Sequence, residues 1–167
     1  MHFTTEHHFQ AAPTRVAALM VDPDFEGAVQ LPDLSPPEVV AHDTDSDAHI
    51  LKLRYEYVGQ LDPMAKRLLA GRQLALVQTV RIDPDTGLGA LTIEAEADPG
   101  RLHGNAQITL TADGAGDGDA SVRGLDGDFV VKVPVIGGTI ERKLLPGILA
   151  RLDVEADALA EHLRAHG

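Results

Sequence analysis

The chain has 167 residues, with 14 basic and 26 acidic side chains and therefore a formal net charge of −12. This length fits one domain with a core of its own, which we expect to span residues 1–167. The absence of cysteine excludes disulfide scaffolds, thiolate metal sites and cysteine nucleophiles, and the negative charge opposes binding to nucleic-acid phosphates or anionic lipid headgroups.

The first third of the chain is expected to combine strands with two short helices. Residues 2–10 alternate in polarity as a strand does. Apolar residues recur at helical spacing over 16–20 before a proline ends the helix, and a second short helix is expected over 24–30. A strand that starts near residue 39 ends in a polar turn, and a further strand over 49–58 resumes the alternation.

The middle of the chain predicts a lid-like helix followed by an antiparallel meander. Residues 61–70 interrupt the β pattern with a proline and then show helical spacing. Four strands follow, separated by turns rich in Asp, Pro and Gly. These strands span about 72–83, 87–97, 101–113 and 120–133. Because polar and apolar residues alternate along them, one face of the sheet should be buried and the other exposed.

A long helix is predicted after Pro134. Apolar residues recur there at spacings of three or four over about 28 residues, which corresponds to a helix of about 40 Å. The stripe consists of Ile136, Ile140, Leu144, Ile148, Leu152, Ala156, Leu159 and Leu163. Pro146 lies inside it and favours a kink, because proline removes one helical hydrogen bond.

Together these elements predict an α+β fold, in which a curved seven-stranded antiparallel sheet wraps around a long C-terminal helix, with two short helices after the first strand. This order resembles the helix-grip fold of the START-like (SRPBCC) superfamily, which includes polyketide cyclases, plant pathogenesis-related proteins and the birch pollen allergen. The segments Tyr57–Leu61, Pro99–Gly104 and Gly127–Lys143 resemble a bacterial family described as a domain of unknown function. The resemblance implies a hydrophobic ligand and supplies no catalytic motif.

The leading hypothesis is binding or transport of a hydrophobic small molecule, such as a lipid, fatty acyl or polyketide-like compound, between the sheet and the last helix. The expected ligand contacts are Leu53, Tyr55, Tyr57, Met64, Leu68, Leu76, Gln78, Leu91, Ile93, Ile108, Phe129, Val131, Ile136, Ile140 and Leu144. The inward-facing polar side chains Tyr55, Tyr57, Gln78 and His7 need a partner in protein, water or ligand. Small residues such as Ala95, Ala97, Gly104 and Ala106 either make room for a guest or let the helix approach closely.

Two alternatives stay open. One is an enzyme of the cyclase or dehydratase type that acts in the same cavity, which a titratable group deep inside and close to a second polar group would favour. The other is an interaction module with a packed interior. We assign no catalytic residue, metal or other cofactor, because His7 and His8 point to opposite faces of a strand and no nucleophile motif is present.

The remaining charged residues fit structural roles. Glu141, Arg142 and Lys143 are expected on the solvated side of the last helix, and Asp126 and Asp128 are expected to pair with Lys132 or Arg142. The N-terminal residues lack the pattern of a secretory signal, and no stretch approaches about 20 apolar residues. We therefore expect a cytoplasmic protein without integral membrane association.

Overall fold

The computed structural model describes residues 1–114 and 118–167. Its seven strands form one antiparallel sheet in the order β1-β7-β6-β5-β4-β3-β2. The strands are β1 (His2–Phe9), β2 (Glu38–Asp43), β3 (His49–Glu56), β4 (Ala75–Ile82), β5 (Leu88–Ala95), β6 (Leu102–Ala112) and β7 (Ser121–Val131). The helices are α1 (Pro13–Met20), α2 (Pro23–Ala28), α3 (Pro63–Leu69) and α4 (Gly137–Ala165).

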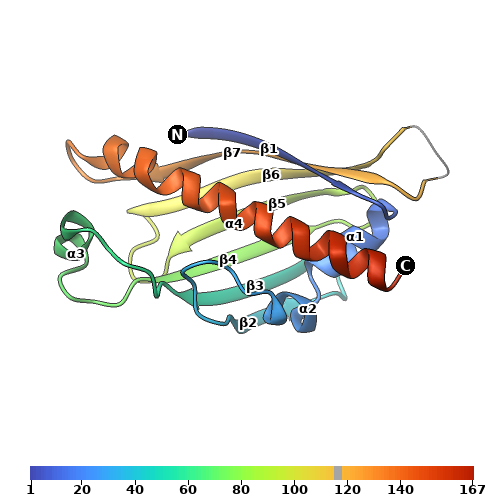
Figure 1. Cartoon of the computed structure of the whole chain (residues 1–167), viewed down its shortest axis with the longest axis horizontal. Helices are drawn as coiled ribbons and strands as arrows, with labels where there is room; N and C mark the ends of the chain where they lie inside the picture. Colours follow the sequence, from blue (N-terminus) through green and yellow to red (C-terminus); the bar gives the residue numbers. More distant parts are fainter. Residues whose placement is uncertain (115–117) are drawn as a thin grey trace.

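The arrangement confirms the predicted helix-grip fold. Helix α4 crosses one face of the sheet obliquely, and α1 and α2 lie beside its C-terminal end (Figure 1). Helix α3 lies at the opposite end of the sheet, near the start of α4 (Figure 1). None of the helices in the described part of the chain has the length and apolar content that crossing a bilayer requires.

Proline fixes the start of each short helix. Pro13, Pro23 and Pro63 each occupy the first helical turn, where the missing N–H costs nothing. Asp22 caps α2 by accepting hydrogen bonds from the backbone of the first turn, and Asp62 caps α3 in the same way. The cap bond from the Ala65 N–H lowers the pKa of Asp62. A left-handed Ala70 and Gly71 end α3, so β4 begins at residue 75, three residues later than predicted.

Helix α4 is packed against the sheet mainly along its C-terminal half. The buried members of the predicted stripe are Leu152, Ala156, Leu159 and Leu163, whereas the members before them are only partly covered. In the N-terminal half the buried leucine is Leu145, and Leu144 is 38% exposed. The helix continues through Pro146. The first half of α4 therefore stands over the sheet without filling the space beneath it.

Two glycines allow close contacts that the fold requires. A Cβ at Gly137 would lie 2.3 Å from the Val131 carbonyl oxygen, so α4 starts directly against the end of β7. A Cβ at Gly127 would lie 2.1 Å from the Asn105 carbonyl oxygen, where β7 meets β6. Any larger residue at either position would have to move the backbone.

The expectation that Glu141 faces solvent is wrong. Its carboxylate accepts a hydrogen bond from the Val131 N–H at 2.9 Å and lies 3.4 Å from the N-terminal ammonium group. These contacts, the backbone bond first among them, lower the pKa of Glu141. Glu141 therefore ties the start of α4 to the end of β7 and to the N-terminus.

The predicted pairing of Asp126 and Asp128 is also wrong. Both carboxylates lie beside His2 on β1, at 3.6 and 3.7 Å, rather than beside a lysine or arginine. Strand pairing explains the difference, because β1 runs next to β7 and places His2 directly opposite Asp128.

Replacing Glu141 by alanine should destabilise the fold by about 1–3 kcal/mol at neutral pH, because a covered N–H loses its acceptor. The Glu141 pKa is lower in the folded chain, so the stabilisation is present at neutral pH and disappears as the pH falls through that lowered pKa. Urea unfolding at several pH values measures both effects. Glu161→Ala on the exposed side of α4 is the control, and equal losses in the two variants would contradict this role.

Candidate functional site

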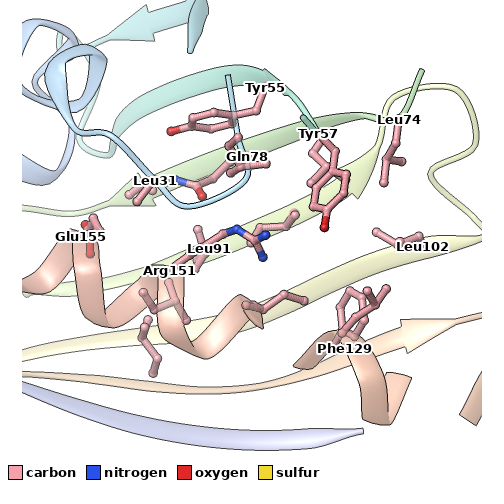
Figure 2. A pocket seen from close by; sticks show the side chains of 18 of the residues that line it. Leu31, Tyr55, Tyr57, Leu74, Gln78, Leu91, Leu102, Phe129, Arg151 and Glu155 are labelled. Atoms are coloured by element: carbon pink, nitrogen blue, oxygen red, sulfur yellow. The ribbon is translucent and has the colours of Figure 1, made fainter. Parts of the chain in front are cut away.

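An apolar cavity of about 110 Å³ lies between the sheet and the N-terminal half of α4. Its sheet wall comes from β3, β4, β5, β6 and β7, and α4 provides Leu144, Ile148 and Leu152 on the opposite side. Figure 2 shows the side chains that surround this inner cavity. Leu31 and Leu34, from the segment between α2 and β2, close one side of it.

A second cavity, of about 260 Å³, adjoins the first toward the α3 end of the molecule. Met64, Leu68 and Leu69 of α3 cover this outer cavity, and Arg72, Arg101 and Lys143 border it. Four leucines line both cavities and therefore lie between them. They are Leu61, Leu74, Leu102 and Leu144. The inner cavity alone is small, but the two together reach the lower end of the roughly 300–1,000 Å³ of typical ligand sites.

The structure brings most of the predicted contact residues to these two cavities. Those that line the inner cavity are Tyr55, Tyr57, Leu76, Gln78, Leu91, Ile93, Ile108, Phe129 and Leu144. Those that line the outer cavity are Met64, Leu68, Val131, Ile140 and Leu144. Leu53 is fully buried in the closed core and lines neither cavity, and Ile136 borders a shallow depression beside α3.

Some of the small residues of the sheet leave room in a cavity, and the others allow close packing. Ala95 and Ala97 line the outer cavity and leave it room. Ala106 is buried in the core, and a Cβ at Gly104 would contact the Phe129 ring at 3.4 Å. Small side chains therefore widen the outer cavity and tighten the packing near β6 and β7.

The inner cavity has a polar floor, which is formed by the buried Arg123 and by Glu155. Arg123 of β7 is 2% exposed, and its guanidinium donates two hydrogen bonds to Glu155 of α4, at 2.7 and 3.0 Å. It also lies 3.1 Å from Nδ1 of His7, which must accept because a guanidinium only donates. His7 Nε2 then donates to Asp153 at 3.0 Å. Arg123 and Glu155 both line the cavity, whereas His7 lies behind them.

Two more ionisable groups lie near this ion pair: Tyr55, which lines the cavity, and Glu26, which does not. Glu26 of α2 is 4% exposed, and its burial, followed by the charge of Glu155, raises the pKa of Glu26 well above its usual value. Burial also raises the pKa of Tyr55, and the Glu26 and Glu155 carboxyls add to that effect. Both shifts favour the protonated forms, the phenol of Tyr55 and the carboxylic acid of Glu26. Glu26 Oε1 and Arg123 Nε have no hydrogen-bond partner among the described residues.

A second arginine closes one side of the cavity. Arg151 of α4 donates through Nε to the Pro32 carbonyl at 2.8 Å and lies 3.7 Å from the Asp33 carboxylate. Its guanidinium also lies over the Tyr57 ring, 5.8 Å from the ring centre, and Figure 2 shows it between the sheet wall and α4. Arg151 thus holds the segment between α2 and β2 against the helix.

Sequence reasoning missed Arg123, Glu155, Arg151 and Glu26. Two signals could have found the first two. Arg123 occupies an inward position in the alternating pattern of β7, between buried Ser121 and Leu125. Glu155 lies three residues after Leu152, on the side of α4 that faces the sheet. Glu26 gave no signal, because an acidic residue near the start of a capped helix is ordinarily exposed.

Comparison with known proteins identifies the family. Residues 4–163 match the family described as a protein of unknown function, DUF2505. The chain belongs to this family. The predicted membership of a family described as a domain of unknown function is thereby confirmed. No curated protein matches the DUF2505 chain at the sequence level.

Solved structures share the fold of this DUF2505 chain at low sequence identity. The protein TTHA0849 from Thermus thermophilus is 15% identical with a TM-score of 0.68, over 100% of this chain and 99% of that one. The ZhuI aromatase/cyclase from a Streptomyces species is 14% identical with a TM-score of 0.64, over 100% and 98%. A START superfamily protein from Mycobacterium smegmatis is 14% identical with a TM-score of 0.53, over 99% of each chain. These likenesses establish the fold.

Arg123→Met should destabilise the chain by about 3–5 kcal/mol, because it leaves Glu155 without its partner inside the protein. The double variant Arg123→Met/Glu155→Met removes both charges and should recover at least about 2 kcal/mol of that loss. Denaturant unfolding measures both. Arg54→Met, in the exposed Arg54–Glu96 pair, should cost less than about 1 kcal/mol. A loss for Arg123→Met as small as this control would contradict the buried ion pair.

Proposed function

We propose that this DUF2505 protein binds a hydrophobic small molecule in the two adjoining cavities between the sheet and the N-terminal half of α4. The observation that carries the proposal is the position of the cavities beneath an apolar helix face. Packed cores contain few voids larger than a water molecule. Here Leu144 and Ile148 of α4 face such a space instead of filling it. A lipid, fatty acyl or polyketide-like compound in the cytoplasm fits this proposal.

The packed-module alternative fits the interior poorly, because the two cavities offer more space than a closed core does. The enzymatic alternative has one observation in its favour, the titratable groups of the polar floor. However, both oxygens of Glu155 are bonded to Arg123, and Tyr55 is kept as the phenol. The floor therefore supplies hydrogen bonds rather than a free base, which supports binding over proton transfer.

Blocking the space between the cavities should prevent binding. Leu74 lines both cavities and precedes β4, so Leu74→Trp places its larger side chain in open space. Titration with the neutral fluorophore N-phenylnaphthylamine should show at least about tenfold weaker binding than in the unaltered protein. Leu88→Trp, at a leucine that is 57% exposed, is the matched control. Equal affinity in the two folded tryptophan variants would refute this location for the site.

Helix α3 should act as a lid over the outer cavity. Leu68 lines that cavity, and α3 contains no buried residue, so Leu68→Asp should leave the fold intact. Because a carboxylate at the cavity wall opposes entry of an apolar molecule, stopped-flow uptake of the same fluorophore should slow and its affinity should fall. Lys66→Asp introduces the same side chain on the exposed side of α3. If Leu68→Asp behaves like this control, the helix is not a lid.

A further inference from the structure

The polar floor of the inner cavity defines the class of ligand more narrowly than hydrophobicity does. We propose that the ligand is an uncharged molecule that carries a hydroxyl or carbonyl oxygen at one end, and that Tyr55 and Gln78 bind this oxygen at the floor of the cavity. This inference rests on the function proposed above. It follows from the balance of charges around the cavity and from the hydrogen-bonding groups that this balance leaves free.

The polar side chains that line the inner cavity come from both of its walls. They are Tyr55, Tyr57, Gln78, Arg123, Arg151 and Glu155. Each arginine among them already has a carboxylate beside it. Arg123 bonds both oxygens of Glu155, and Arg151 lies 3.7 Å from Asp33. The formal charges of these pairs cancel.

A charged ligand end would disturb this balance. A ligand carboxylate at the floor would face the like charge of the Glu155 carboxylate, which lines the cavity. A ligand ammonium group would find the oxygens of Glu155 occupied by Arg123. Either ion would also lose its water without gaining an unpaired counter-charge, which is costly in an apolar cavity. An uncharged end avoids both costs.

The floor still offers hydrogen bonds to an oxygen atom. The Tyr55 hydroxyl and the Gln78 amide have no side-chain hydrogen-bond partner among the described residues, although both side chains line the cavity. They come from neighbouring strands, and Gln78 pairs with Leu53, two residues before Tyr55. Figure 2 shows the two side chains close together on the sheet wall, with Glu155 across from them on α4. A hydroxyl or carbonyl oxygen would accept from both donors, while the hydrocarbon part extends along the leucines toward the outer cavity.

Competition against bound N-phenylnaphthylamine at neutral pH tests this inference. The competitors share one chain length and differ in the end group: 1-decanol, 2-decanone, decanoate and decylamine. We expect the alcohol and the ketone to bind at least about tenfold more tightly than the two ions. Decanoate or decylamine binding as tightly as the alcohol would overturn the inference. A preference for decanoate that disappears in Arg151→Met would assign the ligand end to Arg151 instead, with the same consequence.

Two variants locate the oxygen at the floor. Tyr55→Phe and Gln78→Leu each remove a donor at nearly constant volume and should weaken binding of 1-decanol about three- to tenfold. Binding of N-phenylnaphthylamine, which carries no oxygen, should weaken less than binding of 1-decanol does. Gln107→Leu, on the exposed face of β6, is the matched control, and thermal unfolding verifies that each variant is folded.

The outcomes separate the two proposals. If N-phenylnaphthylamine does not bind the unaltered protein, the proposed function itself fails. If the fluorophore binds, but 1-decanol binds equally well to the unaltered protein, Tyr55→Phe and Gln78→Leu, then only the inference about the ligand class fails.

Discussion

The structure depends on one buried cation. Arg123 occupies an inward position on β7, where an uncompensated charge would be incompatible with folding. Glu155 of α4 supplies the compensating carboxylate through two hydrogen bonds, and this pairing fixes the rotation of α4 above the sheet. On the C-terminal side of the pair, Ala156 and Leu159 pack tightly. On the N-terminal side, the helix covers a hollow. The ion pair therefore marks the boundary between the closed core and the cavity.

The inner cavity lowers the stability of the folded chain, and contacts elsewhere in the molecule offset this cost. Cavities in protein cores cost about 24 cal/mol per Å³, so the inner cavity of about 110 Å³ corresponds to an order of 2–3 kcal/mol relative to a filled interior. The packed half of α4, the capped helix α2 and the Glu141 contacts offset this cost from outside the site. The packed contacts and the proposed binding site thus occupy different parts of the same helix.

Much of this fold could be predicted from periodicity alone. The alternation in β3 to β7 and the stripe of α4 each report which face is buried, and the order of elements then restricts the topology. The pattern could not show that Leu159 and Leu163 are packed whereas Ile140 and Ile148 line cavities, since all four are similar apolar residues on one stripe. Glu141 was misplaced because its partners lie on other elements: the Val131 N–H at the end of β7, and the N-terminus, which the pairing of β1 with β7 brings beside it. Glu26 was missed because the charged groups that act on it, Arg123 and Glu155, come from β7 and α4, far away in the sequence.

The central claim is that the space beneath the first half of α4 holds a hydrophobic molecule. Native mass spectrometry of the protein purified from its own host tests this claim most directly. We expect a species heavier than the polypeptide by the mass of one hydrocarbon-rich compound, and denaturation should release this compound. Spectra that show only the mass of the bare polypeptide under conditions that preserve the fold would contradict it.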